Sequence, residues 1–320
     1  MHLKKKPAGL WLTLALFFSL VMFFVTGCGN AVSSATSSQK ASPAPKSTVS
    51  STLADGDLHV FMLNVGESDA ALVQYKGKSL LIDTGDMDHR EALVKQLKER
   101  GVKELEGVII THPHSDHLGG MAALFQHFKI NHVYDNGVAA NNGMYRNYLK
   151  NIKEKNIPYQ VLRRGDKITL NGDVEFDVMA PEEPLFTKEN TTRMTTNGLT
   201  NNNSIVCRMK YKDFSVLFCG DAQKEAEKKL VKEYGQALQS TVIKIGHHGS
   251  KTSSCPTFIK TVSPQVATIS CGAGNEYKFP HKQTLETLKQ ASVAVYRTDT
   301  DGTISIISDG SAYKMTKEHE

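Results

Sequence analysis

The feature that most constrains the fold is residues 111–120, which read T-H-P-H-S-D-H-L-G-G and directly follow the apolar run 107–110. The segment brings three imidazoles and one carboxylate into six positions: His112, His114, Asp116 and His117. A short loop after a buried strand lets the first two histidines share one ion, while the aspartate and the last histidine turn toward a second. Because imidazole and carboxylate suit zinc, iron or manganese, the spacing favours a two-metal site over surface histidines on a solvated loop.

This H-x-H-x-D-H motif after an apolar strand resembles the metallo-β-lactamase fold superfamily, whose members mostly hydrolyse esters, phosphodiesters or lactams with a metal-bound hydroxide. Residues 80–85, L-L-I-D-T-G, look like the strand and aspartate that precede the motif, and residues 217–221, L-F-C-G-D, look like the strand ending in the bridging aspartate. The segment 243–250, I-K-I-G-H-H-G-S, is similar to the extracellular hydrolase domain of ComEC-type DNA-uptake channels, and V-G-E-S-D-A at 65–70 resembles that subfamily's V-G-Q-G-D-A.

The resemblance covers about residues 58–308 and implies an α/β (α+β) fold, a four-layer αββα sandwich with the site residues at strand ends. Hydrophobic periodicity predicts these strands: 58–64, 69–75, 79–83, 107–111, 131–134, 158–162, 166–170, 173–179, 203–211, 214–219, 241–246, 265–270, 293–297 and 303–308. It predicts these helices: 89–100, 117–128, 222–234, 255–262 and 282–290. The long polar segment 181–203 is expected either to cover the substrate or to be mobile.

The resemblance also implies roles for single residues. Asp221 would bridge two ions, or else cap the helix that follows it. Asp83 would accept a hydrogen bond from a liganding histidine, or else begin a turn. The predicted metal ligands are His112, His114, Asp116, His117, Asp221, His247 and His248, with either His247 or His248 completing the second site. The predicted catalytic residues are Asp116, Asp83 and His281.

Two departures from the resemblance affect the expected site. Many superfamily members carry another histidine before the bridging aspartate, but this chain has none between His132 and His247. Residues 201–206, N-N-N-S-I-V, suggest that an amide oxygen, or only water, completes a weaker first site, so one ion or two could bind. Phe279 stands where the subfamily has histidine, and His281 could partly replace it or lie exposed at a helix start. The candidate substitute ligands or substrate contacts are Asn202, Asn203, Ser204 and Ser250.

The N-terminus resembles a bacterial lipoprotein signal. Three lysines at 4–6 precede an apolar stretch at 10–25, and V-T-G-C at 25–28 places Cys28 as the lipidated first mature residue. An uncleaved membrane helix is the alternative, but 16 residues fall short of the ~17–25 that span a bilayer. We therefore predict a signal peptide at 1–27, a flexible Ser/Ala/Pro-rich tether at 28–56 and a hydrolase domain at 57–320, lipid-anchored at the extracytoplasmic face of the cell membrane.

Charge and cysteine content say less about partners. The net charge is +5, and removing residues 1–27 subtracts three lysines and no acids, which leaves +2. Two basic clusters could contact phosphates or form solvated surfaces: Arg163, Arg164 and Lys167, and Lys224, Lys228, Lys229 and Lys232.

A tight hairpin would pair Cys207 with Phe218 rather than with Cys219, so the four cysteines after Cys28 are expected to pack as buried free thiols.

These observations predict a monomeric, membrane-tethered hydrolase that uses one or two zinc or manganese ions. The leading hypothesis is a phosphodiesterase or nuclease acting on DNA, from the likeness to the DNA-uptake hydrolase domain. Hydrolysis of another ester or a lactam, such as a phosphocholine ester or a β-lactam, is the first alternative. A surface module that binds metal without catalysis is the second. Fold and metals alone permit all three, so the substrate depends on the site.

Overall fold

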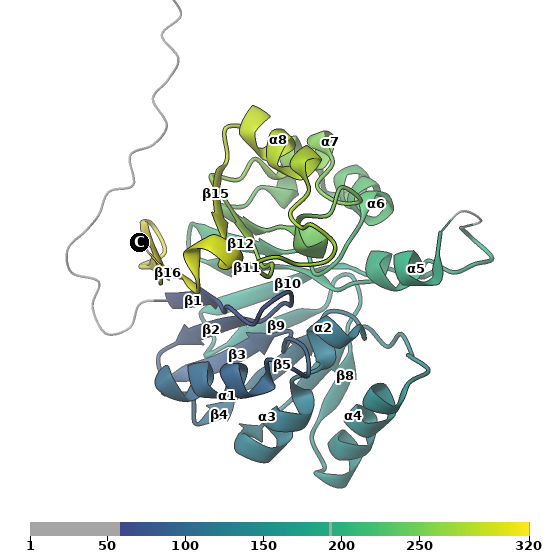
Figure 1. Cartoon of the computed structure of the whole chain (residues 1–320), viewed down its shortest axis with the longest axis vertical. Coiled ribbons are helices and arrows are strands. Elements are labelled where there is room, and N and C mark those ends of the chain that lie inside the picture. The colour runs from purple at the N-terminus through teal and green to yellow at the C-terminus, as the bar shows by residue number, and fades with distance from the viewer. Residues whose placement is uncertain (1–57, 192–193, 320) are drawn as a thin grey trace, which may run out of the picture. The chain divides into compact units, whose positions relative to one another are not determined.

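Two mixed β-sheets pack face to face and carry helices on their outer faces (Figure 1). The computed structural model describes residues 58–191 and 194–319, all within the second of two units, Lys46–Glu320. The predicted signal peptide, lipidated Cys28 and tether lie outside the described residues. Among the helices of the described ranges, none is both long enough and apolar enough to cross a bilayer.

The first sheet has eight strands, in the order β17 (Tyr313–Lys317), β16 (Ile304–Ser308), β1 (Leu58–Met62), β2 (Ala71–Tyr75), β3 (Lys78–Ile82), β5 (Gly107–Ile110), β7 (Val133–Asp135) and β8 (Tyr159–Val161). The second has seven, in the order β15 (Ala294–Arg297), β14 (Val266–Ile269), β13 (Val242–Lys244), β12 (Phe214–Phe218), β11 (Val206–Tyr211), β10 (Val174–Ala180) and β9 (Lys167–Leu170). A separate pair joins β4 (Glu104–Leu105) to β6 (Lys129–Ile130).

Three apolar layers hold the sheets and helices together. Side chains such as Met62, Phe176 and Phe218 fill the space between the sheets. A second layer joins the first sheet to α1 (Arg90–Glu99), α3 (Met121–His127) and α4 (Gly143–Glu154). A third joins the second sheet to α6 (Lys224–Tyr234), α7 (Pro256–Val262) and α8 (Lys282–Gln290). Because the central strands are covered on both faces, they read as continuous apolar runs, and the predicted αββα sandwich is confirmed.

The elements differ from the prediction in a few places. Helix 117–128 is two helices, α2 (Ser115–Leu118) and α3, with two glycines between them. Gly120 lies so close to the Thr84 carbonyl that a Cβ there would clash. The helices α4, α5 (Thr196–Asn202) and α9 (Thr298–Asp301) and the strands β4, β6 and β17 were not predicted. Side-chain caps from Asn142 and Thr195 fix the first turns of α4 and α5.

The four cysteines were expected to be buried free thiols, and Cys255 departs from this because it is only partly buried. Cys207 pairs across the β11–β12 hairpin with Phe218, as the hairpin spacing indicates. Cys207, Cys219, Cys255 and Cys271 are all free thiols, and all but Cys255 are buried. The described part of the chain is therefore held together by packing and hydrogen bonds, without a disulfide.

Candidate metal centre

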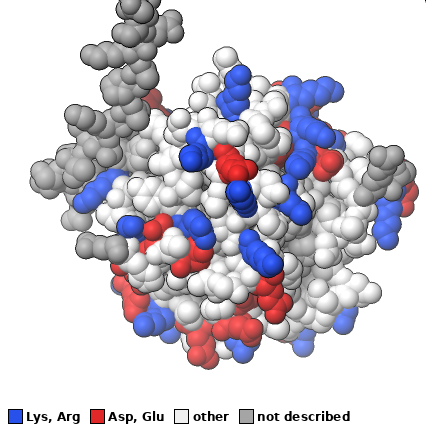
Figure 2. All heavy atoms as spheres, turned by 45° about the horizontal axis from the view of Figure 1, so that its top comes forward, with Lys and Arg blue, Asp and Glu red and all other residues white. Residues whose placement is uncertain are grey.

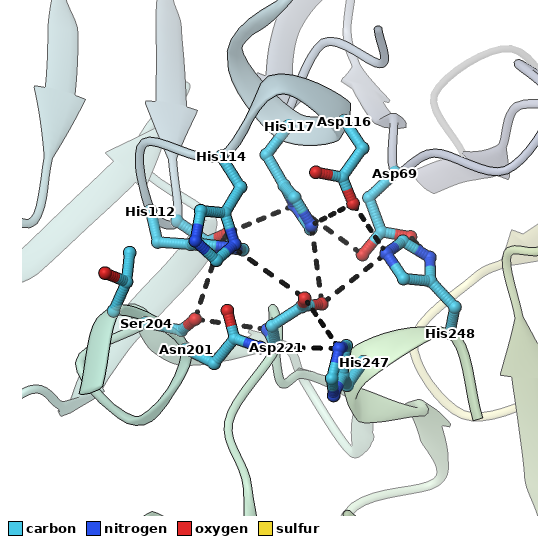
Figure 3. Close-up of polar contacts among 12 residues, drawn as sticks. Asp69, His112, His114, Asp116, His117, Asn201, Ser204, Asp221, His247 and His248 are labelled. Carbon is cyan, nitrogen blue, oxygen red and sulfur yellow. Dashed lines mark hydrogen bonds and ion pairs between the residues drawn. The ribbon is translucent and has the colours of Figure 1, made fainter. Parts of the chain in front are cut away.

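Parallel strand pairing brings the candidate site residues to one edge of the sandwich. Strand β3 runs parallel to β5, and β12, β13 and β14 run parallel to one another. The carboxyl ends of parallel strands meet at the same edge of a sheet, so the loops that follow them converge. Asp83 follows β3, the H-x-H-x-D-H motif follows β5, Asp221 follows β12, and the two adjacent histidines follow β13 (Figure 3).

One group of donors forms around one oxygen of Asp221, and we call it the second site. Its members lie with their ligand atoms within 4.8 Å of one another: Asp116, His117, Asp221 and His248. The His117 Nε2 atom lies 3.3 Å from Asp221 Oδ1 and 3.4 Å from Asp116 Oδ2. The His248 Nε2 atom lies 3.1 Å from the same Asp116 oxygen. Two imidazoles and two carboxylates thus face one point, as a divalent ion requires.

Hydrogen bonds fix which ring nitrogen of each histidine faces this point. The Nδ1 atom of His117 donates to Asp83 Oδ2 at 2.8 Å, and that of His248 donates to the Ser270 carbonyl at 3.0 Å. Each Nε2 lone pair therefore points to the second site. His117 Nε2 and Asp221 Oδ1 are buried and have no hydrogen-bond partner. Unpartnered buried donors and acceptors are costly, so these two atoms fit a centre that binds a cation.

A smaller group faces the other oxygen of Asp221, and we call it the first site. It consists of His112, His114 and Asp221. The Nε2 atom of His112 lies 2.9 Å from Nδ1 of His114 and 3.7 Å from Asp221 Oδ2. The Nδ1 atom of His112 lies 3.2 Å from the Thr111 hydroxyl and 3.3 Å from that of Ser204. This site therefore has two imidazoles and one carboxylate oxygen, one donor fewer than the second site.

The adjacent histidines after β13 take different positions. Both have positive φ angles of 51°, which turn consecutive rings in different directions. His248 belongs to the second site, whereas His247 Nε2 lies 3.7 Å from Asp221 Oδ2, on the first-site side. The Nδ1 atom of His247 is 2.9 Å from the Thr252 hydroxyl. The structure thus favours His248 as the histidine of the second site and leaves His247 beside the first.

The asparagine segment contributes a different residue from those predicted. Asn202 and Asn203 hold backbone: Asn202 Oδ1 accepts from the Ala226 N–H at 3.0 Å, and Asn203 bonds both backbone groups of Phe186. Asn201 instead faces the cluster, with its Nδ2 3.3 Å from His247 Nε2 and its buried Oδ1 without a partner. The expectation for Asn202 and Asn203 is therefore corrected to Asn201, because Asn201 lines the cleft and the other two do not. Figure 3 shows Asn201 beside Asp221.

Three other predicted residues support the site from outside it. Asp83 is buried and accepts hydrogen bonds from the Thr111 N–H and hydroxyl at 2.7 and 2.8 Å, and from His117. It therefore orients His117 and does not line the cleft. Ser250 is also buried and accepts from the Thr252 hydroxyl at 3.0 Å. His281 accepts from the Lys251 N–H at 3.0 Å and does not line the cleft. These contacts argue against a catalytic role for Asp83 or His281 and against a substrate contact for Ser250.

A buried ion pair beneath the cluster was not predicted. Lys244 Nζ lies 2.6 Å from Asp69 Oδ2 and donates to the Ile245 carbonyl at 2.8 Å. The other Asp69 oxygen lies 3.8 Å from His248 Nδ1. The aspartate of the V-G-E-S-D-A segment was a visible signal, but nothing in the sequence indicated that a lysine 175 residues away would reach it.

Burial and neighbouring charges strongly shift the pKa values of the histidines in the cluster. Burial alone would lower the pKa of His248, but Asp221 and Asp69 outweigh it and raise this pKa to about 9. Burial opposes the charges at His117 too, yet Asp83 and Asp221 raise its pKa well above the usual range. By contrast, burial and the neighbouring His117 lower the pKa of His112. Without metal, then, the second site holds excess negative charge that only bound protons offset.

The cluster lies in an open cleft of about 660 Å³. Residues from several loops line it: Glu67, Asp86, Asp88, His114, Ser115, Asp116, Thr195, Asn197, Gly198, Asn201, Asp221, Gln223, His247, His248, Tyr277 and Phe279. Helix α5, within the long segment 181–203, thus forms one wall. The Asp116 side chain is 32% exposed, whereas that of Asp221 is 2% exposed. The cleft therefore gives a substrate direct access to Asp116.

All three members of the first basic cluster and one lysine of the second form ion pairs with carboxylates. Arg163 pairs with Glu183 at 2.7 Å, and Arg164 pairs with Glu182 at 2.7 Å. Lys229 lies 3.4 Å from Glu182 as well. Basic and acidic side chains are interspersed over the face shown in Figure 2. These pairs favour a solvated surface over phosphate contacts at these positions.

Comparison with known proteins places the chain in a family. The family model of the metallo-beta-lactamase superfamily matches residues 63–273, more than half of the chain. The chain therefore belongs to the metallo-β-lactamase superfamily. It is 29% identical over 263 residues to ComE operon protein 3 of Bacillus subtilis and 27% identical over 251 residues to competence protein ComA of Neisseria gonorrhoeae. These matches cover 77% and 78% of this chain but only 32% of either relative, so the chain spans about a third of their length.

Solved structures agree on the fold. The metallo-β-lactamase fold protein YhfI of Bacillus subtilis matches with a TM-score of 0.51 and 11% identity, over 79% of this chain and all of YhfI. CmlA of Streptomyces venezuelae, a diiron β-hydroxylase, matches with a TM-score of 0.50 and 11% identity, over 83% of this chain and 55% of CmlA. At such low identity the likeness shows the fold and leaves the reaction open.

Proposed function

We propose that this chain is a lipid-anchored, extracytoplasmic phosphodiesterase that cleaves DNA with one or two zinc or manganese ions. The observation that carries the proposal is the pair of donor groups around the two oxygens of Asp221, on the floor of an open cleft. Such paired sites suit displacement at phosphorus. Similarity to competence protein ComA of Neisseria gonorrhoeae supports DNA as the substrate, and the lipoprotein-like segment ending at Cys28 supports the anchor.

The positions of the donor atoms indicate which residues would hold each ion. His112, His114 and one oxygen of Asp221 would hold one ion, and Asp116, His117, His248 and the other Asp221 oxygen would hold the second. When bound, such ions supply Lewis acidity and lower the pKa of a water molecule. Asp83 keeps His117 Nε2 turned toward Asp116 and Asp221. The exposed side of Asp116 can orient the attacking water by accepting its hydrogen bond.

The proposal is tested by purifying the protein, loading it separately with manganese and zinc, and measuring cleavage of single- and double-stranded DNA and bis(p-nitrophenyl) phosphate. The control is the double variant His114→Ala with Asp116→Ala, which removes a donor from each site. We expect metal-dependent DNA cleavage that the double variant lacks. Cleavage of the small diester alone would point to another phosphodiester, and no cleavage of any substrate would favour another hydrolase or a binding module.

A second candidate has one specific observation in its favour. The cleft carries Glu67, Asp86 and Asp88 together with the rings of Tyr277 and Phe279. Acidic and aromatic groups together can attract a quaternary ammonium, as in a phosphocholine ester. This candidate predicts release of phosphocholine from a choline ester under conditions in which DNA remains intact.

A further inference from the structure

A row of aromatic rings leads from the surface of the cleft to the candidate metal centre. Tyr277 is 65% exposed, the highest value among the large apolar side chains identified as exposed in the described residues. Its ring lies 5.4 Å from that of Phe279, at an angle of only 16°. The Phe279 ring in turn lies 6.0 Å from that of His248, at 22°. Three nearly parallel rings thus connect a second-site histidine to solvent.

The loop that carries these rings is held firmly. Asn275 Oδ1 accepts from the Phe279 N–H at 2.7 Å, and its Nδ2 donates to the carbonyls of Gly272 and Phe279 at 2.9 and 2.7 Å. In the sequence, Lys278 separates Tyr277 from Phe279, and its φ of 60° is in the left-handed region. With this backbone turn, the two rings stack on each other. The two rings therefore form a preformed platform, and binding of a ligand would cost little free energy for ordering their loop.

The charges of the cleft limit what can bind there. Among the described residues that line it are Glu67, Asp86 and Asp88, but neither lysine nor arginine. Binding along a nucleic-acid backbone normally depends on several cations that contact successive phosphates. Within the described lining, affinity for anything beyond the phosphate at the metal centre therefore depends on uncharged contacts. The exposed ring of Tyr277 offers such a contact in the cleft.

We propose that Tyr277 stacks against one unpaired base adjacent to the scissile phosphate, which makes single-stranded nucleic acid the preferred substrate. This inference rests on the phosphodiesterase activity proposed above. A base in a duplex is paired and already stacked on its neighbours, so it cannot lie flat on the ring. A quaternary ammonium is recognised by aromatic faces that converge into a cage. Here Phe279 covers one face of Tyr277, and a single flat face remains, which fits a planar base better.

The test uses the full-length chain and compares Tyr277→Ala with Tyr277→Phe, which retains the ring. Short single-stranded oligonucleotides carry 2-aminopurine at each position in turn, and the stacking of this base quenches its fluorescence. Quenching is measured with manganese-loaded protein immediately after mixing, so that the metal centre can hold the scissile phosphate while the base stacks. KM is measured with manganese-loaded protein on oligonucleotides with a base or an abasic residue at the position that quenches most.

We expect the wild type and Tyr277→Phe to quench 2-aminopurine and Tyr277→Ala not to do so. The KM of Tyr277→Ala should rise about 5- to 150-fold on the base-containing strand, the range that one stacked base contributes, and stay unchanged on the abasic strand. An unchanged KM on both strands, or an equal rise on both, would overturn the proposal.

The same experiment separates this inference from the proposed function. If no DNA is cleaved under any condition, the nuclease proposal fails and quenching alone decides: quenching lost in Tyr277→Ala supports the platform, and absence of quenching by the wild type overturns it. A Tyr277→Ala variant that loses activity on a choline ester while quenching 2-aminopurine as the wild type does would also overturn base stacking, in favour of cation recognition.

Discussion

The two sides of Asp221 differ in how firmly their imidazoles are held. In the second site, His117 is fixed by the buried carboxylate of Asp83 and His248 by the Ser270 carbonyl. In the first site, His112 has only hydroxyl groups beside its outer nitrogen, and His114 has only His112 as a hydrogen-bond partner among the polar side-chain contacts of the described residues. One half of the centre is preorganised by charged and carbonyl acceptors, and the other half is not.

This difference predicts unequal affinities. A carboxylate or carbonyl that accepts from a liganding imidazole fixes its tautomer and raises its basicity, so the second site should bind its ion more tightly. The first site also lacks the additional histidine that many superfamily members have, and Asn201 and His247 are the polar groups nearest to that gap. The asymmetry therefore predicts stepwise filling, with the second site first.

The largest expected effect comes from Asp221→Ala, which would remove the one residue common to both sites. We expect metal affinity to fall at both sites and activity to fall by at least about 1,000-fold, since both donor groups lose an oxygen. Equilibrium dialysis and cleavage assays check this. Asp88→Ala, which changes an exposed carboxylate at the rim, is the matched control and should retain both ions. An Asp221→Ala protein that still binds one ion tightly would show that the sites are independent.

Asp83→Asn should lower metal affinity at the second site more than at the first. The amide keeps the shape of the side chain but removes the charge that holds His117, so second-site affinity should fall by about 10- to 100-fold. First-site affinity should change less, because Asp83 reaches His112 only through the Thr111 hydroxyl. Metal titrations of the variant and the wild type measure both steps. Equal losses at both sites would contradict the asymmetry.

The second site should also depend on pH. His248 has its pKa raised to about 9 in the metal-free protein, so an ion must displace its proton at lower pH. Because an ion must also displace the proton of His117, whose pKa is raised as well, second-site affinity should fall by at least roughly tenfold for each pH unit below about 9. In the metal-free protein the raised pKa of His248 stabilises the fold fully below about pH 6.5, and this stabilisation is lost as the pH rises through about 9. Metal titrations of the wild type at several pH values test the first statement. Unfolding of metal-free wild type and His248→Ala over the same pH range tests the second, because the variant should lack the His248 contribution.

The smallest expected effect distinguishes two adjacent asparagines. Asn201→Ala should weaken the first site by only a few-fold and leave stability nearly unchanged. Asn202→Ala should leave metal affinity unchanged but cost about 1–3 kcal/mol of unfolding free energy, because the buried Ala226 N–H loses its acceptor. Urea denaturation and metal titration of both variants provide the comparison. The reverse pattern would show that the wrong asparagine has been placed at the site.

Most of the fold and the donor set could be predicted because they depend on local spacing. The H-x-H-x-D-H motif follows a strand that is buried along its whole length, and hairpin geometry alone sets the Cys207–Phe218 pairing. Other features depend on contacts that local patterns do not encode. Which asparagine of the N-N-N run faces the cluster is decided by the turn at the end of α5. The Lys244–Asp69 pair and the Tyr277–Phe279 platform join charge or ring partners that only the folded chain brings together.

The measurement that tests the account most directly is calorimetric titration of the purified protein with manganese and with zinc, together with His248→Ala and His114→Ala. The account predicts two binding steps of unequal affinity in the wild type. His248→Ala should lose the tighter step and keep the weaker one, and His114→Ala should do the opposite. Two equal steps in the wild type, or loss of the tighter step in His114→Ala, would contradict it.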